Sequence, residues 1–577
     1  MRSIITLVSG LLSMNCSRIL PRLICTCIIF SYFFLIILHA VNIPRGDDLY
    51  CLLLFTQSFR DAKSWTQCFQ LLFEQWVEHR IIYSRLTALA SYWLHGTLNF
   101  KTIMIIGNAS LLGITFLIYR LLQRIGLSIS YLLPVVLTLF SPVMYEGNLW
   151  AGAATVYMPV CFTGMLSIYL LTVPSRIAFV SAVFAAILAT YSFGNGMFTF
   201  LAGCAVLLYL KKTLTACLWM LVGLAAALIY FGGFKTHSAT SAFDWAVHFR
   251  YPAYIFYNFS AFVGGIFNYY ENVNGPVALQ NTPAILCGVA ISVFIAWSLF
   301  KIATTRSHDE RGMFAVKATW IGFVIFIGIT SVVIAYSRTS APQMTVVSSR
   351  YKIYSMTAFL LVYLWCLISF KKQRTIGIIF ATTSAILLVF NYFVYYEKFV
   401  NYKSHSLAGL FNYTNRGQWI IYNGSYFEGA SKLICDSIRN NPKPVFHFQP
   451  VFHELSREAL SKAPALLDVR VIENKHSSNR FISSISVGTN AFPTTPNMSQ
   501  GVYLVMYNEE DIVLFAANPL KNGRFNMLRQ RNYFKPGFYL EEDIHRAMRK
   551  GKVYKLAVFC PTEKEKLRLI NHQITGI

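Results

Sequence analysis

Long apolar runs constrain the fold of this chain more than any other feature. A helix needs about 20 predominantly apolar residues to cross the hydrocarbon core of a bilayer, and runs of that kind recur up to Phe393. Of the 577 residues, 55% are hydrophobic and 13% are charged, whereas about 25% of the residues in a soluble protein are charged. The sequence therefore predicts an α-helical polytopic membrane protein.

By the length rule we expect about eleven spans. Three further segments are not counted as spans. We expect the amphipathic segments Ser64–Glu78 and Ile81–His95 to lie at the membrane interface, and Tyr254–Tyr270 to be an interfacial or re-entrant helix. The expected spans are Leu23–Val41, Ile103–Tyr119, Tyr131–Val143, Thr155–Val173, Ile177–Ser192, Met197–Leu210, Leu214–Tyr230, Ala284–Phe300, Trp320–Tyr336, Ile353–Ser369 and Ile376–Phe393.

The distribution of Lys and Arg predicts the orientation of these spans. Arg18 and Arg22 precede the first span, which places the N-terminus in the cytoplasm. The short loops rich in basic residues then fall on the same side, and this pattern breaks if either Ile81–His95 or Tyr254–Tyr270 is counted as a crossing. An odd number of crossings puts the C-terminus on the outer side.

The composition changes near Tyr396, where charged and polar residues become more frequent. Short alternating runs predict strands, and helical patterns alternate with them. We therefore expect a multi-span domain over residues 1–395, with its first outer loop at 42–100, and a soluble α/β or α+β domain over 396–577. The expected strands are Gly501–Met506, Asp511–Phe515 and Val553–Phe559, and the expected helices are Gly429–Arg439 and Leu540–Lys550.

Several classes of function lack support in the sequence. No Walker loop and no Gly-x-Gly-x-x-Gly after a strand is present, so neither ATP nor a dinucleotide is indicated. The twelve cysteines include no Cys-x-x-Cys pair, so no zinc site is indicated. The net charge of +25 is explained by cytoplasmic loops and lipid head groups rather than by nucleic acid.

The expected topology gathers residues with useful chemistry on the outer face. The pair Asp47 and Asp48 suits general base catalysis, arginine binds phosphate with a planar fork of donors, and aromatic rings suit the apolar faces of sugars. Together they suggest transfer of a group from a lipid phosphate to a hydroxyl acceptor. The set is Asp47, Asp48, His79, Arg80, Tyr83, Arg85, Glu146, Trp150, Tyr157, Asn195, Arg338, Arg350, Tyr351, Lys352 and Tyr354.

Each of these residues also has a structural interpretation. Trp150 and Tyr157 fit an interfacial aromatic belt, and Asn195 lies between two glycines, where it would shape a turn. Basic residues on the outer side oppose the positive-inside rule, and they would be stabilised by an anionic ligand, by outer-face acids or by lipid phosphates. The structural alternatives for the rest are a satisfied interface histidine at His79, snorkelling at Arg80 and Arg85, and a turn cap at Glu146.

The motif Gly-Asp-Asp-Leu-Tyr at 46–50, followed by Phe-Glu-Gln-Trp-Val-Glu-His-Arg at 73–80, resembles the first outer loop of the GT-C superfamily of multi-span glycosyltransferases. In similar bacterial members an acidic pair precedes Trp and Asn-Gly-Arg, so Arg80 matches whereas its two neighbours differ. The segments WAGAATVY, YSFGNGMF and SSRYKIYS resemble other outer-face motifs of that family. The resemblance covers about Ile24–Phe393. Within the superfamily, the architecture is similar to that of the O-antigen serotype-converting glucosyltransferases of enteric bacteria and their phages.

The resemblance implies an inverting transfer of a sugar, such as glucose, from a polyprenyl phosphate to a cell-surface glycan such as O-antigen of lipopolysaccharide. Asp47 or Asp48 would accept the proton of the acceptor hydroxyl. A divalent metal at this pair is an alternative that we do not favour, because no further acids or histidines cluster nearby. The phosphate would be held by Arg350 with Arg338 or Lys352 and by Arg80, and sugar or acceptor contacts would come from Trp76, Tyr83, Trp150, Tyr157, Asn195 and Tyr351.

Two other classes of function compete with this hypothesis. An O-antigen polymerase or ligase shares the span number and the outer arginines, but it usually works from a later loop without an acidic motif in the first one. A transporter or flippase predicts charged or broken positions within spans and two related halves, neither of which the sequence displays.

The resemblance places the protein in the inner membrane with its outer face in the oxidising periplasm. Four cysteines would then lie outside. Either Cys51–Cys68 or Cys435–Cys560 would be bridged, or all four would be free thiols.

Overall fold

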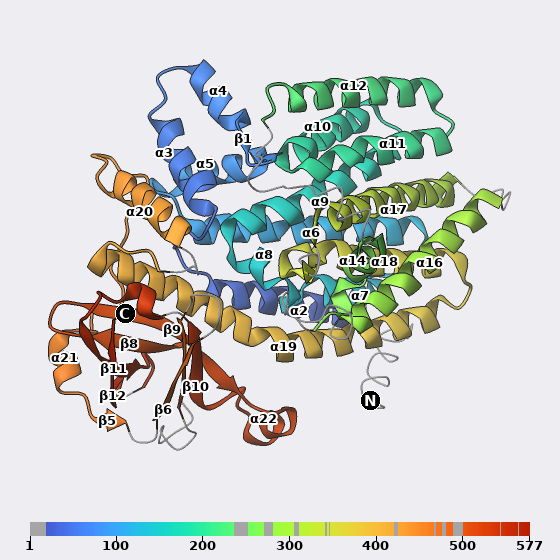
Figure 1. The fold of residues 1–577 in the computed structure, drawn as a ribbon. Coiled ribbons are helices and arrows are strands. Elements are labelled where there is room, and N and C mark those ends of the chain that lie inside the picture. Colours follow the sequence, from blue (N-terminus) through green and yellow to red (C-terminus); the bar gives the residue numbers. More distant parts are fainter. Residues whose placement is uncertain are drawn as a thin grey trace. The chain divides into compact units, whose positions relative to one another are not determined.

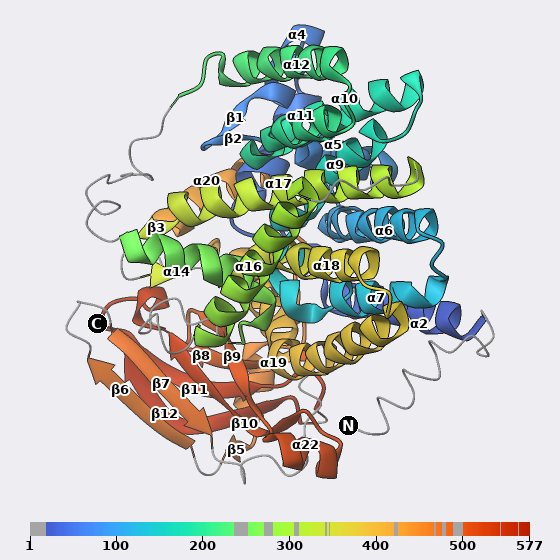
Figure 2. The same ribbon diagram turned by 90° about the vertical axis from the view of Figure 1, so that its right-hand side faces the viewer.

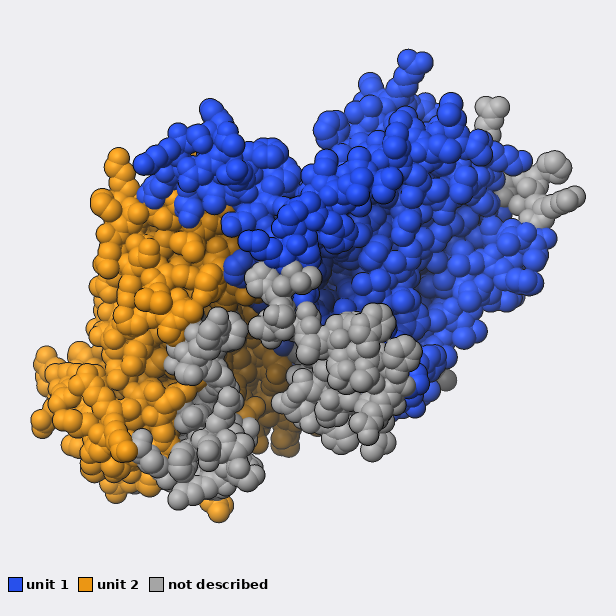
Figure 3. Space-filling view, turned by 45° about the horizontal axis from the view of Figure 1, so that its top comes forward, with its two compact units in different colours: residues 1–38, 58–90, 102–395 blue, residues 39–57, 91–101, 396–577 orange. Residues whose placement is uncertain are grey.

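The described residues form two compact units (Figure 3). Unit 1 comprises Met1–Leu38, Ser58–Ala90 and Thr102–Tyr395, and unit 2 comprises His39–Gln57, Ser91–Lys101 and Tyr396–Ile577. Both ends of the expected first outer loop therefore belong to the unit that contains the C-terminal segment. The computed structural model describes residues 19–235, 252–269, 281–304, 311–340, 343–344, 347–420, 425–466, 469–475, 481–487, 500–542, 544–563 and 565–576.

Some positions used in the sequence analysis lie outside the described residues. They are the segment up to Arg18, which contributed to the predicted orientation, and Tyr270, the last residue of the expected re-entrant segment.

Among the described residues, nine helical segments are long and apolar enough to cross a membrane. The prediction of a mostly helical chain with many apolar helices is confirmed. The two remaining expected spans form shorter apolar helices, α10 (Arg176–Ser192) and α11 (Phe198–Tyr209). Seven of the nine segments are single helices: α2 (Ile19–His39), α6 (Phe100–Arg124), α9 (Ala151–Leu171), α12 (Thr213–Phe231), α16 (Thr282–Thr304), Gly312–Ser337 of α17 (Arg311–Ser337) and α19 (Gln373–Arg416). The other two are built from shorter elements in series: Ile129–Leu149 from η2 (Ile129–Leu132), α7 (Leu133–Leu139), η3 (Pro142–Met144) and α8 (Tyr145–Leu149), and Ser349–Ser369 from η7 (Ser349–Tyr351) and α18 (Lys352–Ser369).

Helices α9 and α18 (Lys352–Ser369) form the interior of unit 1, whereas α12 lies at one edge in both Figure 1 and Figure 2. Helix α9 is apolar on all sides, as expected for a helix surrounded by other helices. Gly107 of α6 allows a close approach to it, because a Cβ atom at Gly107 would lie 2.4 Å from the carbonyl oxygen of Ala154. Small residues thus permit the tight packing around α9.

The expected helix over Ser64–Glu78 is wrong in its second half. Helix α4 (Trp65–Phe73) ends early, and a two-stranded hairpin follows with β1 (Gln75–Trp76) paired to β2 (His79–Arg80). Val77 has a φ of +50° and makes the turn. The hairpin is followed by α5 (Ile82–His95).

Two arginines explain where α4 ends. Arg85 Nη1 donates to the carbonyl oxygens of Leu72 at 3.1 Å and Glu74 at 2.6 Å, and the Arg80 guanidinium donates to the carbonyl of Phe73. These guanidinium groups satisfy carbonyls that a longer helix would have used internally. The helical pattern of the sequence cannot reveal that competition, because the arginines come after the turn.

Unit 2 contains an eight-stranded sheet in the order β5-β12-β11-β8-β9-β10-β7-β6. All neighbouring pairs are antiparallel except β12 with β5. The strands are β5 (Ala465–Leu466), β6 (Val469–Lys475), β7 (Phe481–Val487), β8 (Val502–Tyr507), β9 (Ile512–Lys521), β10 (Phe534–Glu542), β11 (Val553–Phe559) and β12 (Leu567–Thr575). The other elements of this unit are η1 (Leu49–Leu54), α20 (Ser425–Arg439), α21 (Arg457–Ser461), α22 (Arg524–Gln530) and η10 (Ile544–Ala547).

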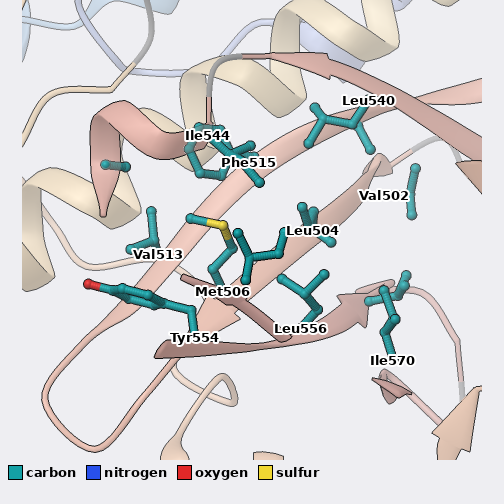
Figure 4. Close-up of a cluster of buried hydrophobic side chains, with 14 of the residues drawn as sticks. Val502, Leu504, Met506, Val513, Phe515, Leu540, Ile544, Tyr554, Leu556 and Ile570 are labelled. Atoms are coloured by element: carbon teal, nitrogen blue, oxygen red, sulfur yellow. The ribbon is translucent and has the colours of Figure 1, made fainter. Parts of the chain in front are cut away.

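The centre of the sheet is buried on both faces. Val502, Leu504 and Met506 of β8 point into one hydrophobic cluster (Figure 4), and Tyr503 and Val505 point into a second one on the opposite face. Alternate residues of a strand face opposite sides, so β8 reads as a nearly continuous apolar run. The three strands expected from the sequence are all present.

The expected helix over Leu540–Lys550 is wrong. Residues up to Glu542 belong to β10, and only the short 3₁₀ turn η10 follows. Phe538 and Leu540 enter the same cluster as β8 (Figure 4 labels Leu540), and β10 pairs with both β9 and β7. Pairing on both sides and burial of alternate residues outweigh the helical propensity of the charged residues that follow.

None of the four cysteines named in the sequence analysis forms a disulfide, so the structure has the unbridged alternative. Burial raises the pKa of the Cys560 thiol to about 12, and it also raises the pKa of Cys435. Both thiols therefore stay protonated and weakly nucleophilic near neutral pH.

A buried ion-pair network closes one end of the sheet. Asp511, whose side chain is nearly inaccessible, pairs with Arg416 of α19 at 3.4 Å and with Arg549 at 3.0 Å, and it accepts a hydrogen bond from the Tyr554 hydroxyl at 3.3 Å. Removal of one partner from a buried pair leaves an uncompensated charge.

We predict that Asp511→Ala destabilises unit 2 by about 3–5 kcal/mol, because Arg416 is left buried without its carboxylate. Hydrogen exchange of the β8 and β9 amides in the full-length protein measures this change. The matched control is Glu458→Ala, because the exposed pair of Glu458 with Lys462 contributes at most about 1 kcal/mol. Equal effects of the two substitutions would contradict a structural role for the Asp511 network.

Candidate functional site

The candidate site in unit 1 lies where α8 (Tyr145–Leu149), the start of α9 and the short 3₁₀ helix η7 (Ser349–Tyr351) meet. The buried Ser349 hydroxyl donates to the Val143 carbonyl at 3.1 Å and accepts the Glu146 backbone N–H at 3.2 Å. The carboxylate of Glu146 in turn accepts the Arg350 backbone N–H at 3.2 Å. These bonds fix η7 on α8 and thereby position the two residues that follow Ser349.

Arg350 is surrounded by aromatic rings. Its Cζ lies 5.7 Å from the centre of the Trp150 ring and 5.4 Å from that of Tyr351, within the range of cation–π attraction. Arg350 Nε and Trp150 Nε1 are both buried, and neither has a hydrogen-bond partner. One unsatisfied buried donor of the guanidinium group and one of the neighbouring indole can bind an anionic or hydroxylated ligand, and they are costly without one.

Aromatic contacts connect Arg350 with the hairpin in the 73–80 segment. Tyr351 meets Tyr157 at 5.2 Å between ring centres, Tyr157 meets Phe193 at 5.3 Å, and Phe193 meets His79 at 3.9 Å. The first two pairs are edge-to-face and the third is tilted, and such ring contacts hold the rings in defined orientations. The structure thus brings Trp150, Tyr157, Arg350 and Tyr351, all predicted site residues, into one cluster.

His79 lies at the other end of this series. Burial and the positive charge of nearby Arg338 lower the pKa of His79 to about 4. Its Nδ1 atom is buried and has no hydrogen-bond partner. A neutral imidazole can donate through one nitrogen and accept through the other, so His79 offers an uncharged polar contact near neutral pH. Arg338 lies within electrostatic range of both His79 and Tyr157.

Asn195 is held in η4 (Gly194–Met197) beside the same cluster. Its Nδ2 donates to the Tyr354 hydroxyl at 2.9 Å and to Thr330 Oγ1 at 3.3 Å. The Oδ1 atom is buried without a hydrogen-bond partner. The amide is therefore oriented by two protein groups and retains one acceptor for a ligand.

Other predicted residues make different contacts. Lys352 is buried, and its Nζ donates to the Tyr395 hydroxyl and to the Asn268 carbonyl at 3.3 Å. Arg80 donates to the carbonyls of Phe73, Tyr230 and Gly232. Both cations thus have protein partners that stabilise the helix ends and loops around them.

Trp76 and Tyr83 lie in the segment that contains the hairpin. Trp76 is the cross-strand partner of His79. Tyr83 lies on α5, where burial raises its pKa and a hydrogen bond with Ser110 partly opposes that effect. The Tyr83–Ser110 hydrogen bond connects α5 with α6.

Asp47 and Asp48 belong to unit 2 and have different environments. Asp48 is fully buried, and its Oδ2 accepts the Arg45 backbone N–H at 3.1 Å, while the Asp48 N–H donates to the Arg45 carbonyl at 3.1 Å. This reciprocal pair closes a turn with Gly46 at a φ of +54°. Asp47 is exposed at the tip of the turn. The chemistry available to solvent at this motif is therefore that of Asp47.

Arg45 directly precedes the Gly-Asp-Asp motif, and it was not assigned to the site from the sequence. Its Cζ stacks 3.6 Å from the centre of the Tyr402 ring, and Nη1 donates to the Tyr402 carbonyl at 3.4 Å. Its position directly before Gly-Asp-Asp was the available signal. Two other features left no signal in the sequence: the hydrogen bond that the Glu146 carboxylate accepts from the Arg350 backbone N–H, and the lowered pKa of His79. Both depend on residues that are remote in sequence.

Within the described part of the chain, no group of three or more His, Cys, Asp or Glu residues could hold a metal ion. Comparisons of the chain with protein-family models, with curated proteins and with solved structures found no match. The described residues define only a class: a mostly helical chain with apolar helices of membrane-spanning length and a C-terminal β-rich domain.

The depressed pKa of His79 predicts a pH dependence of stability. An unfolded histidine has a pKa near 6.5 and the folded one a pKa of about 4, so the unfolded chain binds more protons between these values. The contribution of His79 is complete above pH 6.5 and is lost as the pH falls toward 4. We expect the melting temperature of the purified protein to fall less steeply over this range in His79→Gln than in the wild type.

The matched control for this measurement is Arg338→Gln. Removal of the positive charge raises the pKa of His79 only in part, because burial is the larger cause. An intermediate pH dependence is therefore expected. The same slope in all three proteins would contradict the assigned environment of His79.

Proposed function

We propose that this chain is an integral membrane glycosyltransferase of the GT-C type. It would move a sugar from a polyprenyl phosphate to a hydroxyl of a cell-surface glycan such as O-antigen. The observation that carries the proposal is the cluster around Arg350, in which a guanidinium group lies against Trp150 and Tyr351 while two buried N–H donors lack partners. A sugar phosphate supplies both an anion for the donors and a ring for the aromatic faces.

The proposal includes the topology expected from the sequence. It counts about eleven crossings, with the shorter helices α10 and α11 included. The N-terminus is cytoplasmic, and the C-terminal segment lies in the periplasm beyond the bacterial inner membrane.

The donor side of the reaction is assigned to the cluster around Arg350. As the bond between the sugar C1 and the phosphate oxygen breaks, negative charge grows on the polyprenyl phosphate. The Arg350 guanidinium, with the field of Arg338, stabilises that charge in a desolvated site, where electrostatic effects are strongest. Trp150 and Tyr157 orient the sugar, and Asn195 and neutral His79 hydrogen-bond to its hydroxyls.

The general base is assigned to the Gly-Asp-Asp motif because of its resemblance to the first outer loop of the GT-C superfamily. A carboxylate takes the proton of the acceptor hydroxyl as its oxygen attacks C1 from the face opposite the leaving phosphate, and the configuration at C1 is inverted. Asp47 is the better candidate for this base because it is exposed, whereas Asp48 is buried and bonded to the Arg45 backbone. Asp48 then holds the turn that presents Asp47.

We predict that Arg350→Ala lowers the rate of sugar transfer about 10²–10³-fold, because one electrostatic stabiliser of the leaving phosphate is lost. Arg350→Lys should retain part of the rate, since it keeps the charge but not the planar fork. The assay uses full-length protein in nanodiscs with polyprenyl-phosphate glucose and with lipopolysaccharide from cells that lack the gene.

The matched control is Arg124→Ala. Arg124 also stacks on a tyrosine, 4.3 Å from the centre of the Tyr169 ring, at the end of α6 on the expected cytoplasmic side. Its removal should leave transfer unchanged. If Arg350→Ala transfers sugar at the wild-type rate, Arg350 has no part in the donor site.

A second prediction separates the two carboxylates. Asp47→Asn should reduce transfer about 10²–10⁴-fold, the usual contribution of a general base, with no change in protein level. Asp48→Asn should act mainly on stability, because the amide oxygen can still accept the Arg45 N–H while the charge is lost. Mass and linkage analysis of surface polysaccharide from cells that express each variant measures the effect. Full modification of the glycan in cells that express Asp47→Asn would contradict the assignment of Asp47 as the general base.

A further inference from the structure

The connection between β9 and β10 forms a well-defined projection from unit 2. It runs from Asn522 to Tyr533 and contains α22 (Figure 1). The buried Asn522 closes its base: its backbone N–H donates to the Tyr533 carbonyl at 2.9 Å, and its Nδ2 donates to the Asn532 carbonyl at 3.0 Å and to Gln530 Oε1 at 3.1 Å. The projection is therefore held in one arrangement by its own hydrogen bonds.

Two large apolar side chains of α22 face solvent. Phe525 is 88% exposed and Leu528 is 74% exposed, and no residue of α22 is buried. Residues three apart lie on the same side of a helix, so the two side chains form one apolar spot. Burial in unit 2 does not account for either side chain, and exposed apolar groups at the tip of a fixed projection indicate a contact surface.

Basic residues surround this spot. No Asp or Glu occurs between Asp511 and Glu541. Arg524, Arg529 and Arg531 are exposed. Lys521 and Lys535 flank the projection on β9 and β10. The surface thus combines an apolar pair with several positive charges.

We propose that α22 binds a bilayer surface that carries anionic phospholipid head groups, with Phe525 and Leu528 inserted at the boundary between head groups and acyl chains. Arginine forks match lipid phosphates, and each basic residue near an anionic membrane adds to the attraction. Apolar side chains on a basic helix are typical of interfacial anchors. An acidic glycan as the binding partner would account for the basic residues but not for the exposed Phe525 and Leu528.

The position of unit 2 in the chain supports a lipid partner. Helix α19 begins as the last candidate span and continues past Tyr396, where unit 2 resumes. A domain joined in this way to a membrane helix remains at a high effective concentration near the lipid surface. One short helix with a weak affinity for lipid is then sufficient to bind the bilayer surface. Because the loop that carries this helix is already ordered, binding costs little conformational entropy.

Hydrogen exchange of the full-length protein tests the proposal. The peptide that covers 522–533 is compared in nanodiscs of phosphatidylglycerol and phosphatidylcholine, in nanodiscs of phosphatidylcholine alone, and in neutral detergent. We expect exchange to be about ten-fold slower or more in the anionic nanodiscs, given the gain per basic residue near such a surface. The double variant Phe525→Ser/Leu528→Ser should lose this protection, and so should the triple variant with Arg524, Arg529 and Arg531 changed to Gln.

The matched control is Leu433→Ser, which removes another exposed apolar side chain of unit 2, on α20, and should leave the protection intact. Unchanged exchange of β8 amides in every variant establishes that the fold is retained. Equal exchange of 522–533 in all three environments would overturn the proposal, as would equal slowing in neutral and anionic nanodiscs. Protection that requires added lipopolysaccharide glycan instead of anionic lipid would also overturn it.

Discussion

The structure depends above all on the cost of leaving polar groups unsatisfied among apolar helices. Most polar side chains inside unit 1 meet this constraint: the Tyr32 hydroxyl lies 2.8 Å from Asn108 Oδ1 and 2.7 Å from Asn148 Oδ1, and Trp320 Nε1 donates to the Leu361 carbonyl at 2.8 Å. Four buried atoms that do not meet it belong to His79, Trp150, Asn195 and Arg350. Ring contacts through Phe193, Tyr157 and Tyr351 link His79 to the neighbourhood of Arg350 and Trp150, and Asn195 bonds to Tyr354, three residues after Tyr351. These four atoms thus belong to one cluster that a ligand would complete, whereas other unpartnered buried atoms, such as Trp365 Nε1 and Asn391 Oδ1, belong to other parts of unit 1.

The same constraint explains why neighbouring cations differ in character. Lys352 lies two residues beyond Arg350, yet its ammonium group is satisfied by Tyr395 and the Asn268 carbonyl. Arg80 is satisfied by three carbonyls. Arg350 Nε is buried without a partner, beside aromatic rings that attract a cation but accept only weakly. A basic residue on the expected outer face is thus a candidate ligand contact only when the fold leaves its donors available.

In unit 2 a single turn places the two carboxylates of one motif in different environments. The hydrogen bonds between Arg45 and Asp48 bury Asp48 and expose Asp47. A similar device operates at Asn522, whose buried amide holds the base of a loop and exposes Phe525 and Leu528. In both places a hydrogen bond between a side chain and the nearby backbone determines which neighbouring side chains are exposed.

The sequence by itself determined the apolar helices, the central strands β8, β9 and β11, and most members of the Arg350 cluster, because hydrophobic periodicity and the succession of charged loops are local properties. Only the tertiary structure decided the early end of α4, the strand β10 in place of a helix, and the separate environment of Lys352. The depressed pKa of His79 and the difference between Asp47 and Asp48 also emerged only there. Each of these features depends on a hydrogen bond, a strand pair or a desolvated neighbour supplied through the fold, and none of these leaves a periodic signal along the chain.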